Sequence, residues 1–196
     1  LWHASVVARE RAIEVAVASA AQHFQLCRRG SPWPSHHRPS EGEERGLWAA
    51  GGHAHVRTQR ASGITPVRIE VFGAHPAEPV LRGSQHAAEV SLSAGGHLGV
   101  FGGDADGSEA PSTTVEVPSG PLRLRVAWFG LVEGGDDDGS GEAIVLQLWP
   151  EEPHEPAIVR CWDPWDLPPP QATSPGGLHQ IEGRERVLSK LAVLEH

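Results

Sequence analysis

Hydrophobic and polar residues alternate over most of the chain between residues 67 and 149. In the clearest example, a single charged residue separates Val67 from Ile69, and another separates Ile69 from Val71. Apolar residues at every second position favour a strand with one face in a core and the other toward solvent. Further alternating runs lie at 53–59, 89–93 and 97–101, and a mainly apolar run lies at 143–149. The pattern predicts a series of short strands, and the last run, apolar on both faces, predicts a central one.

Glycine and proline predict two turns within this series. Gly95-Gly96 is predicted to be a turn between two of the strands. Pro118-Ser119-Gly120-Pro121 is predicted to be the loop of a hairpin over 113–131, which would place Glu116 opposite Arg123 on its outer face. The inner face of the hairpin would then carry Val115, Val117, Leu122, Leu124, Val126 and Trp128.

Residues 10–26 fit two interpretations. Ile13, Val15 and Val17 alternate with other residues and suggest a strand, with a second strand after it. Ile13, Val17 and Phe24 also fit one face of a helix, and the alanine content supports helix formation. The alternation favours strands because the β-branched residues occupy the alternating positions, but the helix stays open at this point.

The whole pattern predicts an all-β fold, with about nine to eleven strands at the spacing of a mostly antiparallel β-sandwich or jelly roll. No amphipathic helix lies between the strands to serve as a crossover in a parallel sheet. The last residues resemble the scar of a C-terminal polyhistidine vector. The expected organisation is a β-sandwich domain over 1–166 with a long surface loop at 30–46, a Pro/Gly linker at 167–180, a short C-terminal helix at 181–193 and a tag remnant at 194–196.

Composition and charge narrow the class of protein. Of 196 residues, 39% are hydrophobic and 21% are charged, as in a soluble globular protein. A net charge of −9 without a basic stripe argues against nucleic-acid binding. No apolar run is long enough to span a membrane. Cys27 and Cys161 lack metal-site spacing and are expected to be two buried thiols of a cytoplasmic protein. Lys190 is the single lysine, whereas arginine is frequent. This usage favours a bacterial source with a GC-rich genome.

Two groups of residues are candidates for a site. His53 and His55 would share one face of a strand, about 6–7 Å apart, and could chelate a divalent metal as cupins do. No carboxylate follows them at the spacing of a cupin site. Apart from this possible divalent metal, no cofactor is expected. Trp33, Trp162 and Trp165 could form a patch that stacks on sugar rings. A purely structural role is the alternative for both groups, because histidine is frequent in this chain and buried tryptophan usually belongs to the core.

The runs Thr113-Thr114-Val115-Glu116-Val117-Pro118-Ser119-Gly120-Pro121-Leu122-Arg123-Leu124-Arg125-Val126 and Ile144-Val145-Leu146-Gln147-Leu148-Trp149-Pro150 resemble an uncharacterised actinobacterial β-sandwich family. They are also distantly similar to the ComJ-type competence proteins, whose associated role is nuclease inhibition. The resemblance covers about residues 85–163 and departs at Leu122, where an aromatic residue usually follows the turn. It implies a fold and a protein partner, and it carries over no catalytic residue.

Three functions follow as hypotheses. The first is a non-enzymatic bacterial protein that acts as a protein-interaction or inhibitor/immunity-like module. It rests on the acidic charge, on the resemblance, and on a sequence without a nucleophile elbow or a P-loop. The second is a cupin-like metal-binding protein or enzyme that uses His53 and His55. The third is a carbohydrate-binding module built on the tryptophan patch. The sequence leaves the oligomeric state and the identity of any partner open.

Overall fold

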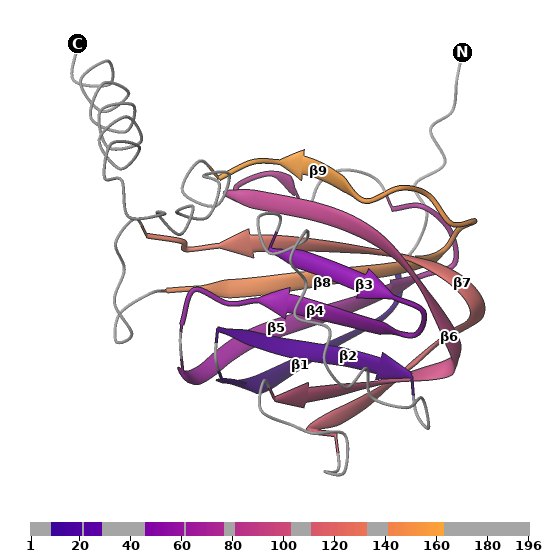
Figure 1. Cartoon of the computed structure of the whole chain (residues 1–196), viewed down its shortest axis with the longest axis horizontal. Helices are drawn as coiled ribbons and strands as arrows, with labels where there is room; N and C mark the ends of the chain where they lie inside the picture. Colours follow the sequence, from indigo (N-terminus) through magenta and orange to yellow (C-terminus); the bar gives the residue numbers. More distant parts are fainter. Residues whose placement is uncertain are drawn as a thin grey trace, which may run out of the picture. The chain divides into compact units, whose positions relative to one another are not determined.

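In the computed structural model, residues 9–20, 22–28, 46–60, 62–76, 81–102, 111–132 and 141–162 are described. They form nine strands and no α-helix (Figure 1), so the all-β class is confirmed for this part of the chain. The linker at 167–180, the helix at 181–193 and most of the loop at 30–46 lie outside the described residues. The strands are β1 (Arg9–Ala20), β2 (His23–Arg28), β3 (Leu47–Ala50), β4 (His53–Arg57), β5 (Ser62–Phe72), β6 (His86–Gly102), β7 (Thr113–Phe129), β8 (Ala143–Pro150) and β9 (Ala157–Arg160).

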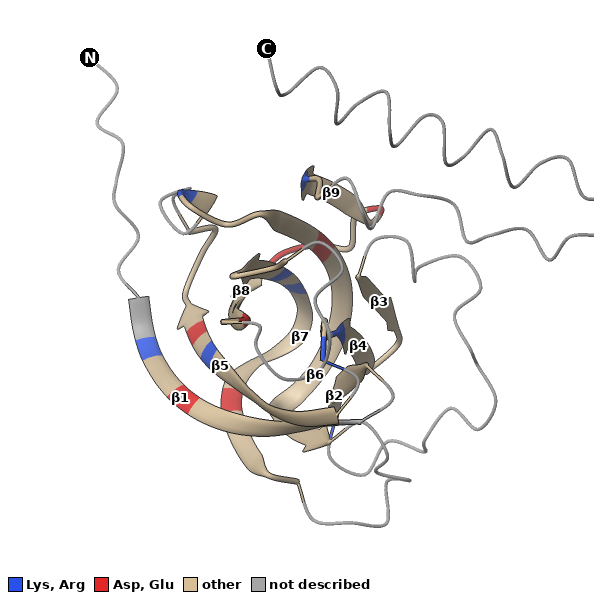
Figure 2. Ribbon diagram, turned by 90° about the vertical axis from the view of Figure 1, so that its left-hand side faces the viewer, with Lys and Arg blue, Asp and Glu red and all other residues tan. Residues whose placement is uncertain are grey.

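All nine strands belong to one mixed sheet with the order β3-β4-β2-β1-β5-β8-β7-β6-β9. Only β5 and β8 pair in parallel, and the other eight pairings are antiparallel, as the sequence predicts. β2 pairs with β6 as well, so the sheet curls around its own core (Figure 2). The expected sandwich has two sheets, whereas here long, bent strands wrap the core within a single one.

The N-terminal segment is a pair of strands, so the strand interpretation of residues 10–26 is confirmed. β1 pairs with β5 along almost its whole length. Val17 is fully buried, and Ile13 and Val15 pack against the same core from half-buried positions. β-branched side chains at alternate positions suit a pleated surface better than a helix, where they lose rotamer freedom. Gln22, which has a φ of 64°, lies between β1 and β2.

The two predicted turns at Gly95-Gly96 and at 118–121 are wrong. The first lies inside β6 and the second inside β7, and each strand is 17 residues long. β6 and β7 pair with each other on both sides of these positions, and Gly95 lies opposite Ser119. Two turn-like segments that face each other across a hairpin therefore bend it without ending either strand.

A β-bulge explains why the buried face changes within β7. Between Gly95 and His97, β6 advances by two residues, whereas β7 moves by three, from Ser119 to Glu116. The extra residue in β7 shifts its side-chain alternation by one, because strand side chains alternate with a period of two. Gly96 and Gly120 have φ values of 91° and 107°, which glycine adopts without strain. All six residues predicted for the inner face are buried as a result.

The predicted ion pair between Glu116 and Arg123 does not form, because the two residues do not face each other in one hairpin. Glu116 forms an ion pair with Arg11 of β1 instead. Arg123 is paired with Glu89 of β6, with 3.2 Å between Nε and Oε2. The residues of β7 on the two sides of the bulge therefore form ion pairs with different strands.

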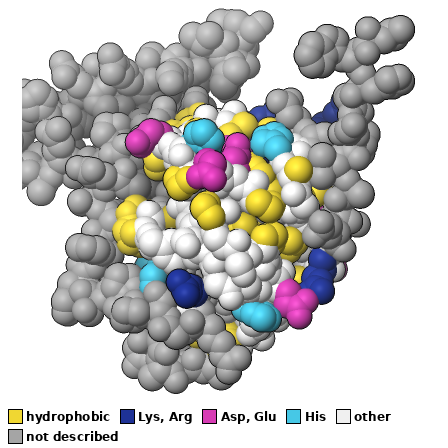
Figure 3. Space-filling model, turned by 90° about the vertical axis from the view of Figure 1, so that its right-hand side faces the viewer, with side chains coloured by type: hydrophobic (Ala, Val, Ile, Leu, Met, Phe, Trp, Pro, Cys, Tyr) yellow, Lys and Arg dark blue, Asp and Glu magenta, His cyan; other side chains and the backbone are white. Residues whose placement is uncertain are grey.

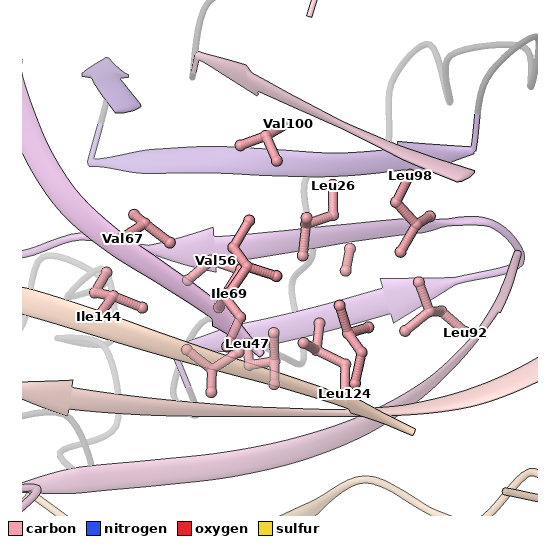
Figure 4. Packing of buried hydrophobic residues seen from close by; sticks show 14 of the residues in the cluster. Leu26, Leu47, Val56, Val67, Ile69, Leu92, Leu98, Val100, Leu124 and Ile144 are labelled. Carbon is pink, nitrogen blue, oxygen red and sulfur yellow. The ribbon is translucent and has the colours of Figure 1, made fainter. Parts of the chain in front are cut away.

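The hydrophobic core fills the concave side of the curled sheet (Figure 4). Val67 and Ile69 of β5 lie beside Ile144 of β8, and this region also contains Leu124 of β7 and Leu26 of β2. β8 lies between β5 and β7, as expected for a central strand. Trp128 is fully buried in this core, as predicted, whereas Trp149 is fully buried on the opposite face of the sheet, against His75 and Arg125. The Trp128 indole N–H donates a 2.8 Å hydrogen bond to the carbonyl of Arg57.

Candidate functional site

The histidines of β4 lie on the sheet face opposite the core. Ala54 and Val56 of β4 belong to the core cluster, so the alternating residues His53 and His55 share the other face, as predicted. The neighbouring strand β2 brings His23 to the same face. The rings of His23 and His55 have centroids 5.6 Å apart. The structure therefore adds a cross-strand histidine that the spacing on β4 alone does not reveal.

His55 lies at the centre of this group. Its ring packs against the edge of Trp48 from β3, with centroids 5.1 Å apart. Burial, and then the nearby His23 and His53, lower the pKa of His55 from 6.5 to about 4. Its Nε2 atom is buried without a hydrogen-bond partner. A neutral imidazole with an unused nitrogen is able to accept a hydrogen bond or a metal ion.

Thiol and carboxylate ligands do not complete a site here. Cys27 lies opposite His53 in the β2–β4 register, and its thiol donates to the carbonyl of Arg28 at 3.2 Å. Burial raises the pKa of this thiol. Across the described ranges, no group of three or more His, Cys, Asp and Glu side chains could hold a metal ion. Metal binding by His53 and His55 therefore stays a prediction.

The predicted tryptophan patch is described only at Trp162, because Trp33 and Trp165 lie outside the described residues. Trp162 is half-buried and packs against the core cluster. Its backbone N–H donates to Nδ1 of His86 at 3.1 Å. Sugar binding by the three tryptophans stays a prediction. Cys161, which precedes Trp162, is exposed, so the expectation of two buried thiols is wrong for this residue.

A row of charged and polar side chains crosses four strands on the convex face of the sheet, and its burial was not anticipated from the sequence. Glu70, Gln147, Arg125 and Glu89 are directly paired in register across β5, β8, β7 and β6. Figure 2 shows the acidic and basic bands on β5, β6 and β7. Gln147 donates to Glu70 at 3.1 Å, and Arg125 donates to Gln147 at 3.3 Å and to Glu89 at 2.6 Å. Only the strand pairing, which the sequence pattern leaves open, aligns these residues.

Arg123 extends this row toward the segment 151–156, which connects β8 to β9. Its guanidinium donates to the carbonyls of His154 and Glu155, each at 3.0 Å. Ser91 of β6 bonds both the N–H and the carbonyl of His154, at 2.9 and 3.1 Å. These contacts fix the connecting segment over β6 and β7, and with it the start of β9.

β9 is one end of the sheet, and it pairs with β6 along one edge. No other strand among the described residues pairs with its second edge. Ile158 and Val159 are 40% and 41% exposed. Consecutive residues of a strand point to opposite faces, so apolar side chains flank this edge on both faces. In Figure 3, acidic and histidine side chains gather beside hydrophobic ones at the height where Figure 1 places β9. We call residues 151–160 the β9 edge segment.

Comparison with known proteins defines the fold class more closely than the function. No family profile and no curated protein matches the chain. The structure of the Bacillus subtilis protein ComJ, described as an inhibitor of the DNA-degrading activity of NucA, is 12% identical, with a TM-score of 0.49 over 74% of this chain and 98% of that one. The product of crocagin biosynthetic gene J is 15% identical, with a TM-score of 0.50 over 72% of this chain and 98% of that one. The second likeness supports the fold, and neither one assigns an activity. Within the described ranges, no helix is long and apolar enough to cross a membrane.

Proposed function

We propose that this protein is a non-enzymatic interaction module that binds a protein partner along the β9 edge segment. The observation that carries the proposal is the pair of exposed apolar residues on an outer strand. Outer strands in natural proteins are usually protected by charge, by proline or by a covering segment, because an open edge pairs with other chains. Ile158 and Val159 leave apolar surface on both faces of this edge. An extended peptide that adds to the sheet as a further strand is the partner such an edge fits.

The charge of the β9 edge segment favours a basic partner. Glu151, Glu152 and Glu155 contribute three negative charges against the one positive charge of Arg160, which gives −2 with histidine neutral. Glu152 and Glu155 are exposed. The whole chain carries −9. Complementary charge raises association rates and discriminates against acidic partners.

The segment is held in place before any partner binds. Arg123 and Ser91 bind its backbone at His154 and Glu155, as described above. At the other end, Arg160 donates to the carbonyl of Leu81 at 2.9 Å and also to that of Ser84. A pre-ordered edge loses less conformational entropy on binding than a loop that must order first.

In our proposal, the buried charged residues on the convex face have a structural role. Glu70, Arg125 and Glu89 are hydrogen-bonded into one row, and Arg125 is also held over the ring of Trp149 at 5.1 Å. These contacts link β5, β8, β7 and β6 side by side in the sheet that carries β9. The inhibitor or immunity-like role expected from the sequence is the narrower form of this proposal, in which capture blocks the activity of the partner.

A capture experiment with matched variants tests the proposal. The protein without a tag is coupled to a resin and exposed to a lysate of its source organism, beside the double variant Ile158→Lys/Val159→Lys. The control is Ile64→Lys, which alters an exposed apolar residue of β5 (55% exposed). We expect one protein to be retained by the wild type and by Ile64→Lys, and lost from the double variant. Its affinity, measured after purification, should fall with added salt.

Two results would contradict the proposal. One is retention of the same proteins by the double variant and by the wild type, which would place binding elsewhere. The other is a captured protein whose affinity does not change between low and high salt, since this would remove the role of the acidic edge. If the partner is an enzyme, its activity measured in the presence and in the absence of the protein that carries β9 separates inhibition from simple binding.

A further inference from the structure

We propose that His23 and His55 form a two-histidine site for one divalent transition-metal ion. The site lies on β2 and β4, and the proposal does not depend on the binding role of β9. It differs from the pair expected from sequence, because the partner of His55 is the cross-strand His23 and not His53, its neighbour on the same strand.

The distance between the two rings carries the proposal. Their centroids are 5.6 Å apart, and the ring planes are inclined at 32°. Two imidazoles that share an ion place their ring centres about 5–6 Å apart, because each Zn–N bond is about 2.0–2.1 Å long. The separation of His23 and His55 therefore suits a bound ion without movement of either strand. Both side chains are half-buried.

One ring nitrogen of the pair is available to an ion. Nε2 of His55 is buried and has no hydrogen-bond partner. Such an atom costs free energy unless an ion or a water molecule satisfies it. Nε2 of His23 lies 3.5 Å from Nε2 of Gln25, at the outer limit of a hydrogen bond. Imidazole nitrogen suits Cu²⁺, Ni²⁺ and Zn²⁺ better than it suits Mg²⁺ or Ca²⁺.

Trp48 provides a spectroscopic reporter of the site. Its ring lies 5.1 Å from that of His55. Cu²⁺ quenches indole fluorescence at short range, so binding at His55 should quench Trp48 more strongly than the other six tryptophans. The variant Trp48→Phe should lose most of this quenching and keep its affinity for Zn²⁺.

The test is titration of the protein, without a polyhistidine tag, with ZnCl₂ by calorimetry and with CuCl₂ by fluorescence. We expect one ion per chain, and a loss of about tenfold or more in affinity in His23→Ala and in His55→Ala, since each 1.4 kcal/mol of lost coordination is tenfold. His97→Ala removes an exposed histidine of β6 and should leave the affinity unchanged. His23→Ala alone decides the outcome if His55→Ala does not fold.

Three results would overturn the proposal. The first is the absence of saturable Zn²⁺ binding at millimolar concentration. The second is full affinity in His23→Ala with loss in His53→Ala, which would place the ion on β4 alone. The third is equal affinity in all variants, His97→Ala included. None of these results bears on the β9 edge segment, so failure here is distinguishable from failure of the proposed function.

Discussion

Replacement of Arg123 by methionine should remove the hydrogen bonds that hold the β9 edge segment against the sheet. The Arg123 side chain is only 5% exposed and joins three elements through its guanidinium. Nε pairs with Glu89 at 3.2 Å, Nη1 donates to Ser91 and His154, and Nη2 donates to Glu155, each of these at 3.0 Å. Methionine fills much of the same volume and donates none of these bonds, so the change isolates the polar contacts.

The expected loss of stability follows from these contacts. Removal of one partner of a buried ion pair costs about 3–5 kcal/mol, because the remaining charge stays buried. Arg125 still neutralises Glu89, with 2.6 Å between Nε and Oε1, which reduces this part of the cost. The carbonyls of His154 and Glu155 lose donors, and each hydrogen bond from a charged group contributes about 1.5–3 kcal/mol. The two carbonyl bonds together give about 3–6 kcal/mol, and we expect a total in this range, a large share of the 5–15 kcal/mol that stabilises a typical domain.

Urea unfolding and hydrogen exchange measure the two parts of this prediction. The free energy of unfolding should fall by the stated amount, and the amides of 151–160 should exchange faster than in the wild type. The control is Arg11→Met, which removes an ion pair to Glu116 whose side chains are 49% and 61% exposed. Exposed pairs contribute less than about 1 kcal/mol. A loss in Arg123→Met no larger than that in Arg11→Met, or unchanged exchange at 151–160, would refute the reasoning.

Three further changes have defined consequences. Gly130→Ala should cost about 2 kcal/mol or more in urea unfolding, because φ at this residue is 68° and a Cβ would collide with the carbonyl oxygen of Gly141. Trp128→Phe should cost about 1–3 kcal/mol in the same assay, since the carbonyl of Arg57 loses its indole donor. Stability should fall as pH decreases from about 6.5 toward 4, because the pKa of His55 is lowered to about 4 and the unfolded chain binds more protons in this window. In His55→Gln this loss, at most about 3 kcal/mol for a single group, should be absent from the unfolding curves.

The alternation of hydrophobic residues predicts the strands and their buried faces well. Val67, Ile69 and Val71 are all buried, and the change of buried face between Val117 and Leu122 occurs as expected. The sequence does not show which structure produces that change. Glycine is common in both turns and β-bulges, so its presence does not distinguish them. The two structures differ in which strand pairs with the residues before and after the glycine. Here the partner of both halves is β6, a long-range pairing that no local pattern encodes.

The residues of the candidate sites are also predictable from the sequence only where they do not depend on strand pairing. His53 and His55 share a face because they are two residues apart on one strand, and this the sequence can predict. His23 joins them only through the antiparallel pairing of β2 with β4. Arg123 and Arg125 alternate with apolar residues, and the same period predicts an exposed face. Their burial arises from the covering segment and from partners on other strands.

Hydrogen exchange of the captured complex tests the role of β9 most directly. The partner retained by the wild-type resin is purified, and the exchange of 157–160 is compared in the free and bound protein. Added strand pairing would place its backbone N–H groups in hydrogen bonds, so we predict slower exchange at β9 with little change at β3, the other end of the sheet. Unchanged exchange at 157–160 in a saturated complex, with protection elsewhere, would contradict the proposal that this edge binds the partner.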